Sequence, residues 1–110
     1  MAKFMAVFTG TPGAARPDLD EATIARGMEA WGAWMAKHAD RISDGGGPLG
    51  KTKKVSKAGI ADIHNNLTGF VVFEADDHDA AARLFEGHPH FTIFPGEGVE
   101  VMPVLPIPGR

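Results

Sequence analysis

Two short, almost unbroken apolar runs set the strongest limits on what this chain can fold into. Phe4–Phe8 is closed by glycine, threonine and proline, and Gly69–Ala75 is closed by the acidic stretch Asp76–Asp79. Runs of this length between helix-breaking or helix-starting residues predict buried β-strands. Because successive strand residues face opposite sides of a sheet, strands that are apolar at nearly every position need cover on both faces.

The segment between these two strands carries a helical period. Apolar residues step by three and four along it, which predicts one helix from about Asp20 to Asp40 with its apolar stripe against a sheet. Asp18, with Glu21 three residues later, resembles a capping box at its start. A second, short helix is predicted over Ala80–Phe85, and Gly87 is expected to end it in the left-handed conformation. The apolar stripe of the first helix consists of Ile24, Met28, Trp31, Met35, Ala39 and Ile42.

Glycine and proline divide the remaining chain. Three successive glycines and a proline predict that Asp44–Gly50 is a loop. Lys53–Ser56 and Ile60–Ile63 predict the two arms of a β-hairpin, and Val99–Val104 predicts a last strand. Residues 104–110 are expected to form an extended, proline-rich tail.

The predicted order is β-α-(β-hairpin)-β-α-β, the split βαβ pattern of ferredoxin-like α+β domains. We therefore expect one domain over residues 1–110, with a four-stranded antiparallel sheet, two helices on one face and an inserted hairpin. The helices cover one face only, whereas the strands are apolar on both. A second copy of the sheet is the simplest cover, so we expect a homodimer that forms a dimeric α/β barrel.

Composition excludes several classes of function. The net charge of -3 leaves no basic footprint for nucleic acid or for an anionic membrane. The absence of cysteine excludes disulfides and thiolate chemistry and fits a cytoplasmic protein. No stretch approaches the roughly 18 apolar residues of a membrane span.

His88 and His90 flank a proline where the second helix gives way to the last strand. Imidazole titrates in the physiological range, so we expect one of the pair to act as a general base, with Asp44 orienting it or the substrate. The competing interpretation is that they cap a helix end or face solvent. A metal site needs three or more ligands, and His-x-His supplies two, so we expect no metal and no cofactor.

Three further residues are candidates for ligand contact. Trp34 and His38 lie at positions i and i+4 on one flank of the helical stripe, where they are expected to line a pocket. The alternative is that Trp34 belongs to the core or the dimer interface, with its N–H on a nearby acceptor. Glu29 projects away from the stripe, so it meets a ligand only if a partner subunit or a bent helix covers it.

Several segments in order along the chain resemble the YCII-related (YCII-like, DGPF-type) family of dimeric α+β barrel proteins. This resemblance implies a ferredoxin-like dimer with a cleft between sheet and helices. Some members carry a His on the first helix and an Asp before a proline after the second; the corresponding positions here are Glu29 and His88, so the pair is exchanged. The segments that carry the resemblance are Met28–Met35, Asp44–Gly50, Gly69–Asp76, Gly87–His90 and Gly98–Pro103.

We therefore expect a protein that binds a small organic molecule in the cleft of a homodimer, with histidine acid–base chemistry in the enzymatic version. A non-catalytic dimeric binding or interaction module is the first alternative. A cofactor-free monooxygenase is a weaker one, since fold analogy alone supports it. No residue in the sequence specifies a reaction or a substrate.

Overall fold

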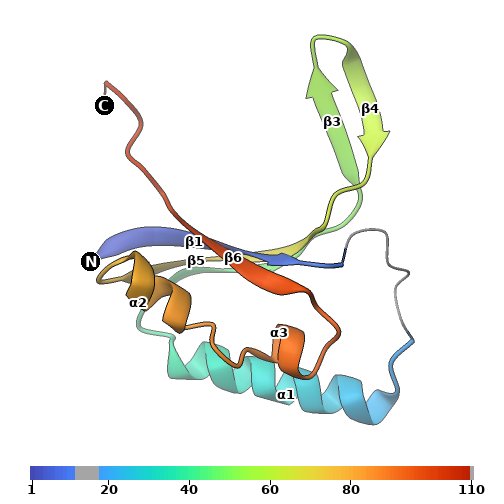
Figure 1. Cartoon of the computed structure of the whole chain (residues 1–110), viewed down its shortest axis with the longest axis vertical. Coiled ribbons are helices and arrows are strands. Elements are labelled where there is room, and N and C mark those ends of the chain that lie inside the picture. The colour runs from blue at the N-terminus through green and yellow to red at the C-terminus, as the bar shows by residue number, and fades with distance from the viewer. Residues whose placement is uncertain (12–17, 110) are drawn as a thin grey trace.

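The computed structural model describes residues 1–11 and 18–109 as one antiparallel sheet with helices on one of its faces (Figure 1). The strand order is β2-β5-β1-β6, with a separate β3–β4 hairpin. This is the expected ferredoxin-like α+β architecture, and the predicted fold class is confirmed. The elements are β1 (Ala2–Thr9), α1 (Glu21–Lys37), β2 (Ile42–Pro48), β3 (Thr52–Ser56), β4 (Gly59–Ile63), β5 (Leu67–Ala75), α2 (His78–Arg83), α3 (Pro89–Thr92) and β6 (Gly98–Pro103).

The prediction of a loop at Asp44–Gly50 is wrong, because most of this segment belongs to β2. β2 is an edge strand that pairs with β5. The register of this pairing shifts twice, between Ile42 and Asp44 and between Asp44 and Gly47. An edge position and bulges are where glycine and proline are tolerated in a sheet. Gly46 adopts a φ of 64°, which lets the chain bulge there and still return to the ladder.

Helix α1 is shorter than predicted at its C-terminal end. Asp20, not Asp18, is the N-cap, and its carboxylate accepts a hydrogen bond from the Thr23 amide at 2.6 Å. The helix ends at Lys37, so Ala39 lies beyond it and Ile42 lies in β2. The stripe is also less buried than predicted, since Ile24 and Met28 are exposed.

Pairing of β1 with β5 builds the core. Phe4 lies opposite Phe73, Ala6 opposite Val71, and Phe8 opposite Gly69. These residues face the helices, and all of them are buried. Phe85, after α2, packs on Phe8 and Phe73 at ring-centroid distances of 6.1 and 5.4 Å. Each buried phenylalanine contributes about 1.5 to 3 kcal/mol to stability.

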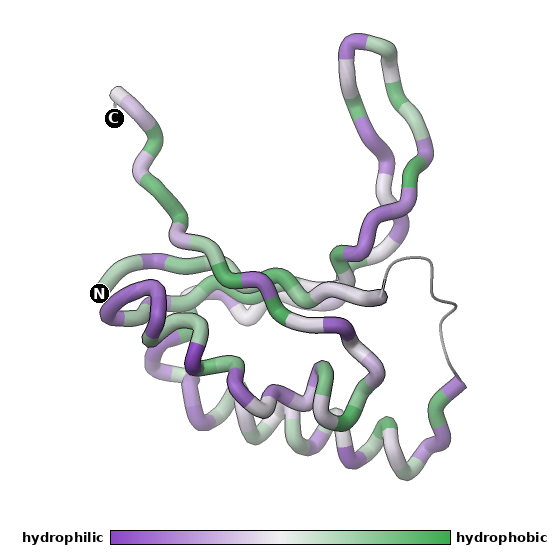
Figure 2. Tube along the Cα trace, in the orientation of Figure 1, coloured by the Kyte–Doolittle hydropathy of each residue, from purple (hydrophilic) through white to green (hydrophobic). Residues whose placement is uncertain are grey.

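Among the described residues, no helix lies on the other face of the sheet (Figure 1). Met5 lies between Val72 and Met102 on this face, and Val7 lies between Phe70 and Glu100. The β3–β4 hairpin and the C-terminal tail both rise on this side, and each carries green apolar positions in Figure 2. From Val104 to Gly109 the tail has neither helix nor strand. No helix within residues 1–11 and 18–109 has the length and apolar character needed to cross a bilayer.

The bulge at Gly46 provides a test of this fold. A Cβ there would lie 1.8 Å from the Phe70 carbonyl oxygen, whereas a Cβ at Gly50 would meet no atom within 4 Å. We expect Gly46→Ala to lower the free energy of unfolding by at least about 2 kcal/mol, through backbone strain and overlap. Gly50→Ala is the matched control and should leave stability unchanged or slightly raised. Urea unfolding curves measure both, and equal midpoints would contradict the β2–β5 register.

Candidate functional site

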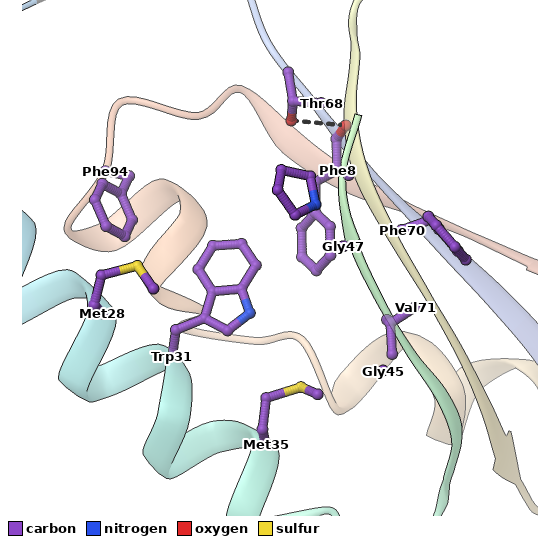
Figure 3. A pocket seen from close by; sticks show the side chains of 12 residues that line it. Phe8, Met28, Trp31, Met35, Gly45, Gly47, Thr68, Phe70, Val71 and Phe94 are labelled. Carbon is purple, nitrogen blue, oxygen red and sulfur yellow. Dashed lines mark hydrogen bonds between the residues drawn. The ribbon is translucent and has the colours of Figure 1, made fainter. Parts of the chain in front are cut away.

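A cavity of about 360 Å³ lies between α1 and the glycine-rich end of the sheet (Figure 3). Helix α1 supplies one wall through Met28, Trp31 and Met35, which all point toward the strands. The opposite wall comes from β1, β2 and β5, and one end is closed by Phe94, which follows α3. The strand and loop residues that line it are Phe8, Gly45, Gly47, Pro48, Thr68, Gly69, Phe70, Val71 and Phe94.

The lining is apolar and aromatic, with a single hydroxyl. Thr68 Oγ1 donates to the Phe8 carbonyl at 3.1 Å, so the sheet itself already uses this hydroxyl (Figure 3). Glycines 45, 47 and 69 leave the strand wall without side chains opposite the helix. Among the described residues the lining contains no acid, base or amide side chain. Such a cavity selects a ligand by shape and aromatic contact.

His88 does not line this cavity but contacts Phe8 and Trp31, which do. Its side chain is 0% exposed, and its Nδ1 accepts a hydrogen bond from the His90 amide at 3.0 Å, which caps α3. Because Nδ1 accepts, the neutral ring carries its proton on Nε2. That Nε2 has no hydrogen-bond partner within the described part of the chain.

Aromatic rings surround the His88 imidazole. The ring centroids of Trp31, Trp34 and Phe8 lie 4.6, 4.9 and 5.1 Å from it. Burial, together with the charges of the neighbouring His90 and His38, lowers the pKa of His88 from 6.5 to about 4. At neutral pH the ring is therefore uncharged, and it is not poised to exchange protons in the physiological range.

His90 ties α3 to the end of β1. Its Nε2–H donates to the Thr9 carbonyl at 2.8 Å, and its ring is buried. Gly96 makes this packing possible, because a Cβ there would lie 2.3 Å from His90 Nε2. The structure thus brings His88 and His90 together, but neither lines the cavity and neither faces solvent.

The other predicted site residues lie elsewhere. Trp34 donates its Nε1–H to the Leu84 carbonyl at 2.9 Å, and the His38 ring lies 4.8 Å from it. Both line a second, more open pocket of about 390 Å³ between α1 and α2, together with Lys37, Arg83 and Glu86. Desolvation by burial, followed by the charges of Lys37 and Arg41, lowers the pKa of His38.

Asp44 and Glu29 are exposed and join neither histidine. Asp44 Oδ1 accepts from the Gly46 amide at 2.9 Å, which stabilises the bulge in β2. No hydrogen bond links Asp44 or Glu29 to His88 or His90 in residues 1–11 and 18–109. In the same residues no group of three or more His, Asp or Glu side chains is placed to hold a metal ion.

Sequence reasoning missed the residues that line the cavity. Met28, Trp31 and Met35 were assigned to the buried stripe of a helix, which explains their spacing equally well. The signal that could have separated the two interpretations is the glycine run at 45–47, because glycines opposite long side chains leave unfilled space. Three successive glycines predict a loop equally well, so the cavity could not be predicted from them.

Fold and cavity together define an α+β protein of the ferredoxin-like type with an apolar, ligand-sized cavity between its first helix and its sheet. No family model and no curated protein matches the sequence. A solved structure with the same fold is 5-chloro-2-hydroxyhydroquinone dehydrochlorinase from Burkholderia phenoliruptrix AC1100, in complex with 2,5-dihydroxybenzoquinone. The TM-score is 0.56 at 18% sequence identity, over 91% of this chain and 90% of that one. The likeness confirms the fold type of the dimeric α+β barrels.

Burial of His88 predicts a pH dependence of stability. The unfolded chain binds a proton at this imidazole below pH 6.5, whereas the folded chain does so only below about 4. The free energy of unfolding therefore carries no penalty from His88 above pH 6.5. As the pH drops toward 4, protonation of the unfolded chain lowers this free energy by about 2 to 3 kcal/mol.

Urea unfolding at about pH 7.5 and about pH 5 measures this loss. His88→Asn keeps a side-chain acceptor for the His90 amide and should reduce the difference between the two pH values. His64→Asn, at an exposed position, is the matched control and should leave the difference as in the wild type. An equal pH dependence in His88→Asn and the wild type would contradict the prediction.

Proposed function

We propose that this chain is a YCII-like protein that binds a small, planar and largely apolar organic molecule in the cavity between α1 and the sheet. The observation that carries the proposal is the cavity itself, with Trp31, Phe8 and Phe94 around a space of about 360 Å³. This volume falls within the range of small-molecule sites, which are mostly apolar and aromatic. The complex of the dehydrochlorinase with a benzoquinone supports a ligand of this kind.

Binding, rather than acid–base catalysis by His88 or His90, is the function we propose. A general base must come within hydrogen-bond reach of the proton that it removes. His90 Nε2 already donates to Thr9, and His88 is enclosed by aromatic rings in a neutral form. Asp44, on the surface of β2, is occupied by a backbone amide. A monooxygenase activity has no support beyond fold analogy.

Blocking the cavity from its strand wall tests the binding proposal. A Cβ at Gly45 would lie 3.1 Å from the Met35 Cε, so Gly45→Leu directs a side chain at the helix wall. We expect this variant to bind 2,5-dihydroxybenzoquinone at least about tenfold more weakly, because leucine fills the space of the ligand. Isothermal titration calorimetry measures the dissociation constants.

Gly50→Leu is the matched control, since Gly50 does not line the cavity and a Cβ there meets no atom within 4 Å. Methionine methyl resonances give a second measurement on the same samples. The ligand should shift Met28 and Met35, which line the cavity, and leave Met5 and Met102 in place. Failure of the wild type to bind any planar ring compound, or shifts at Met5 and Met102 alone, would overturn the proposal.

The second part of the proposal is that two copies associate through the helix-free face of the sheet. Met5, Val72 and Met102 form an apolar surface there, in which Met5 and Val72 are half-buried and Met102 is 40% exposed. The hairpin adds Val55 and Ile60, which are 75% and 72% exposed. Apolar surface of this kind on a soluble protein marks an interface. The lack of cysteine supports placing this dimer in the reducing cytoplasm.

Charge also favours a second copy as the occupant of this face. The hairpin region carries Lys51, Lys53, Lys54 and Lys57 against Asp62 alone, and Lys53 is bound to Asp62 at 2.7 Å. The helix-free face carries Glu100, and Glu74 lies there opposite Lys3. In a two-fold arrangement the basic hairpin of one copy meets Glu100 of the other.

Met5→Lys should convert the dimer to a monomer, because Met5 lies between Val72 and Met102 and the new charge has no acidic cross-strand partner. Ala33→Lys, on the exposed side of α1, is the matched control and should leave the dimer intact. Sedimentation equilibrium at micromolar concentration measures the mass, with about twice 11.7 kDa expected for the wild type. A wild-type monomer would refute the dimer and leave the cavity proposal standing.

A further inference from the structure

The Nε2–H of His88 is a buried hydrogen-bond donor that the folded chain leaves without an acceptor. Its position is held by the Nδ1 contact with the His90 amide, which also specifies the tautomer. The side chain is 0% exposed, and no partner for Nε2 lies in the described residues. Leaving such a donor unpaired in an apolar site destabilises the fold, and buried polar groups of this kind call for an explanation.

Two tryptophans enclose this donor, and each one also lines a pocket. Trp31 contacts the His88 ring and lines the apolar cavity, and Trp34 contacts the same ring and lines the pocket between α1 and α2. The two indoles are held differently. Trp34 is fixed through its Nε1–H on the Leu84 carbonyl, whereas Trp31 donates to no acceptor in the described part of the chain.

Because only Trp34 is held by a hydrogen bond, we expect the His88 Nε2–H to become accessible on the side of Trp31. Trp31 is only partly buried and is held by ring contacts with Phe8, His88 and Phe94. Turning its indole breaks no hydrogen bond among the described residues. Turning Trp34 would break one. The Phe8 ring has less room to turn, because it is buried against Phe85, His88 and His90.

We infer that Trp31 is a gate and that His88 Nε2–H is the polar recognition group of the cavity, which makes the ligand an aromatic compound with a carbonyl oxygen. This inference rests on the proposed function and adds the chemical class of the ligand. When the ligand enters, the Trp31 indole turns aside and stacks on the aromatic ring, and the carbonyl oxygen accepts from Nε2–H. His88 is a specificity residue in this scheme and transfers no proton.

Acetophenone and α-methylstyrene are the probes, because they have nearly the same shape and differ in having a C=O or a C=CH2 group. In the scheme above, His88→Asn removes Nε2 and keeps an acceptor for the His90 amide. We expect this substitution to weaken acetophenone binding by about tenfold and to leave α-methylstyrene binding within about twofold, as for the loss of one hydrogen bond. His64→Asn is the control and should change neither affinity.

Nitrogen-edited NMR of the imidazoles provides an independent readout. Acetophenone should move the His88 Nε2–H proton downfield, and α-methylstyrene should not, whereas a merely structural His88 would respond to both probes alike. If both probes bind but His88→Asn weakens them equally or not at all, the inference is overturned and the proposed function stands. If neither probe nor 2,5-dihydroxybenzoquinone binds the wild type, both are overturned.

Discussion

The antiparallel pairing of β1 with β5 is the constraint on which the rest of the structure depends. It joins the two apolar runs of the sequence at the centre of the sheet and aligns Phe4 with Phe73 and Phe8 with Gly69. The aromatic layer that results supports Trp31, Trp34 and Phe85 on the helix side. The same register places Gly69 beside Phe8. Because Gly69 has no side chain, space remains at the strand wall of the cavity.

Most of the architecture could be predicted from the sequence, because it follows from local patterns. Four predicted strands appear close to their predicted bounds: the apolar runs Phe4–Phe8 and Gly69–Ala75, and the two hairpin arms on either side of the Lys57–Gly59 turn. Edge strand β2 could not be predicted in this way. Glycine has a low propensity for strands, so the local sequence of β2 does not predict one. The strand forms because it pairs with β5 and accommodates a bulge at Gly46.

The candidate site was less predictable than the fold, since it depends on what lies opposite each side chain. The sequence places His88 and His90 two residues apart, but the burial of His88 depends on Trp31, Trp34 and Phe8, which come from other elements. The sequence suggests these histidines as acid–base groups, but burial removes that role from His88. An exposed imidazole titrates near neutral pH, whereas the low pKa of His88 keeps it neutral and makes it a hydrogen-bond donor instead.

Both faces of the sheet leave apolar groups incompletely packed, but in different ways. On the helix face, glycines 45, 47 and 69 leave space that α1 does not fill, so unfilled volume remains inside one chain. On the opposite face, Met5 and Val72 are only half-buried and Met102 is exposed within the described part of the chain. Filling the first requires a molecule of ligand size, and covering the second requires a surface as broad as the sheet. A small molecule in the cavity and a second copy on the open face satisfy these requirements independently, because the sheet lies between them.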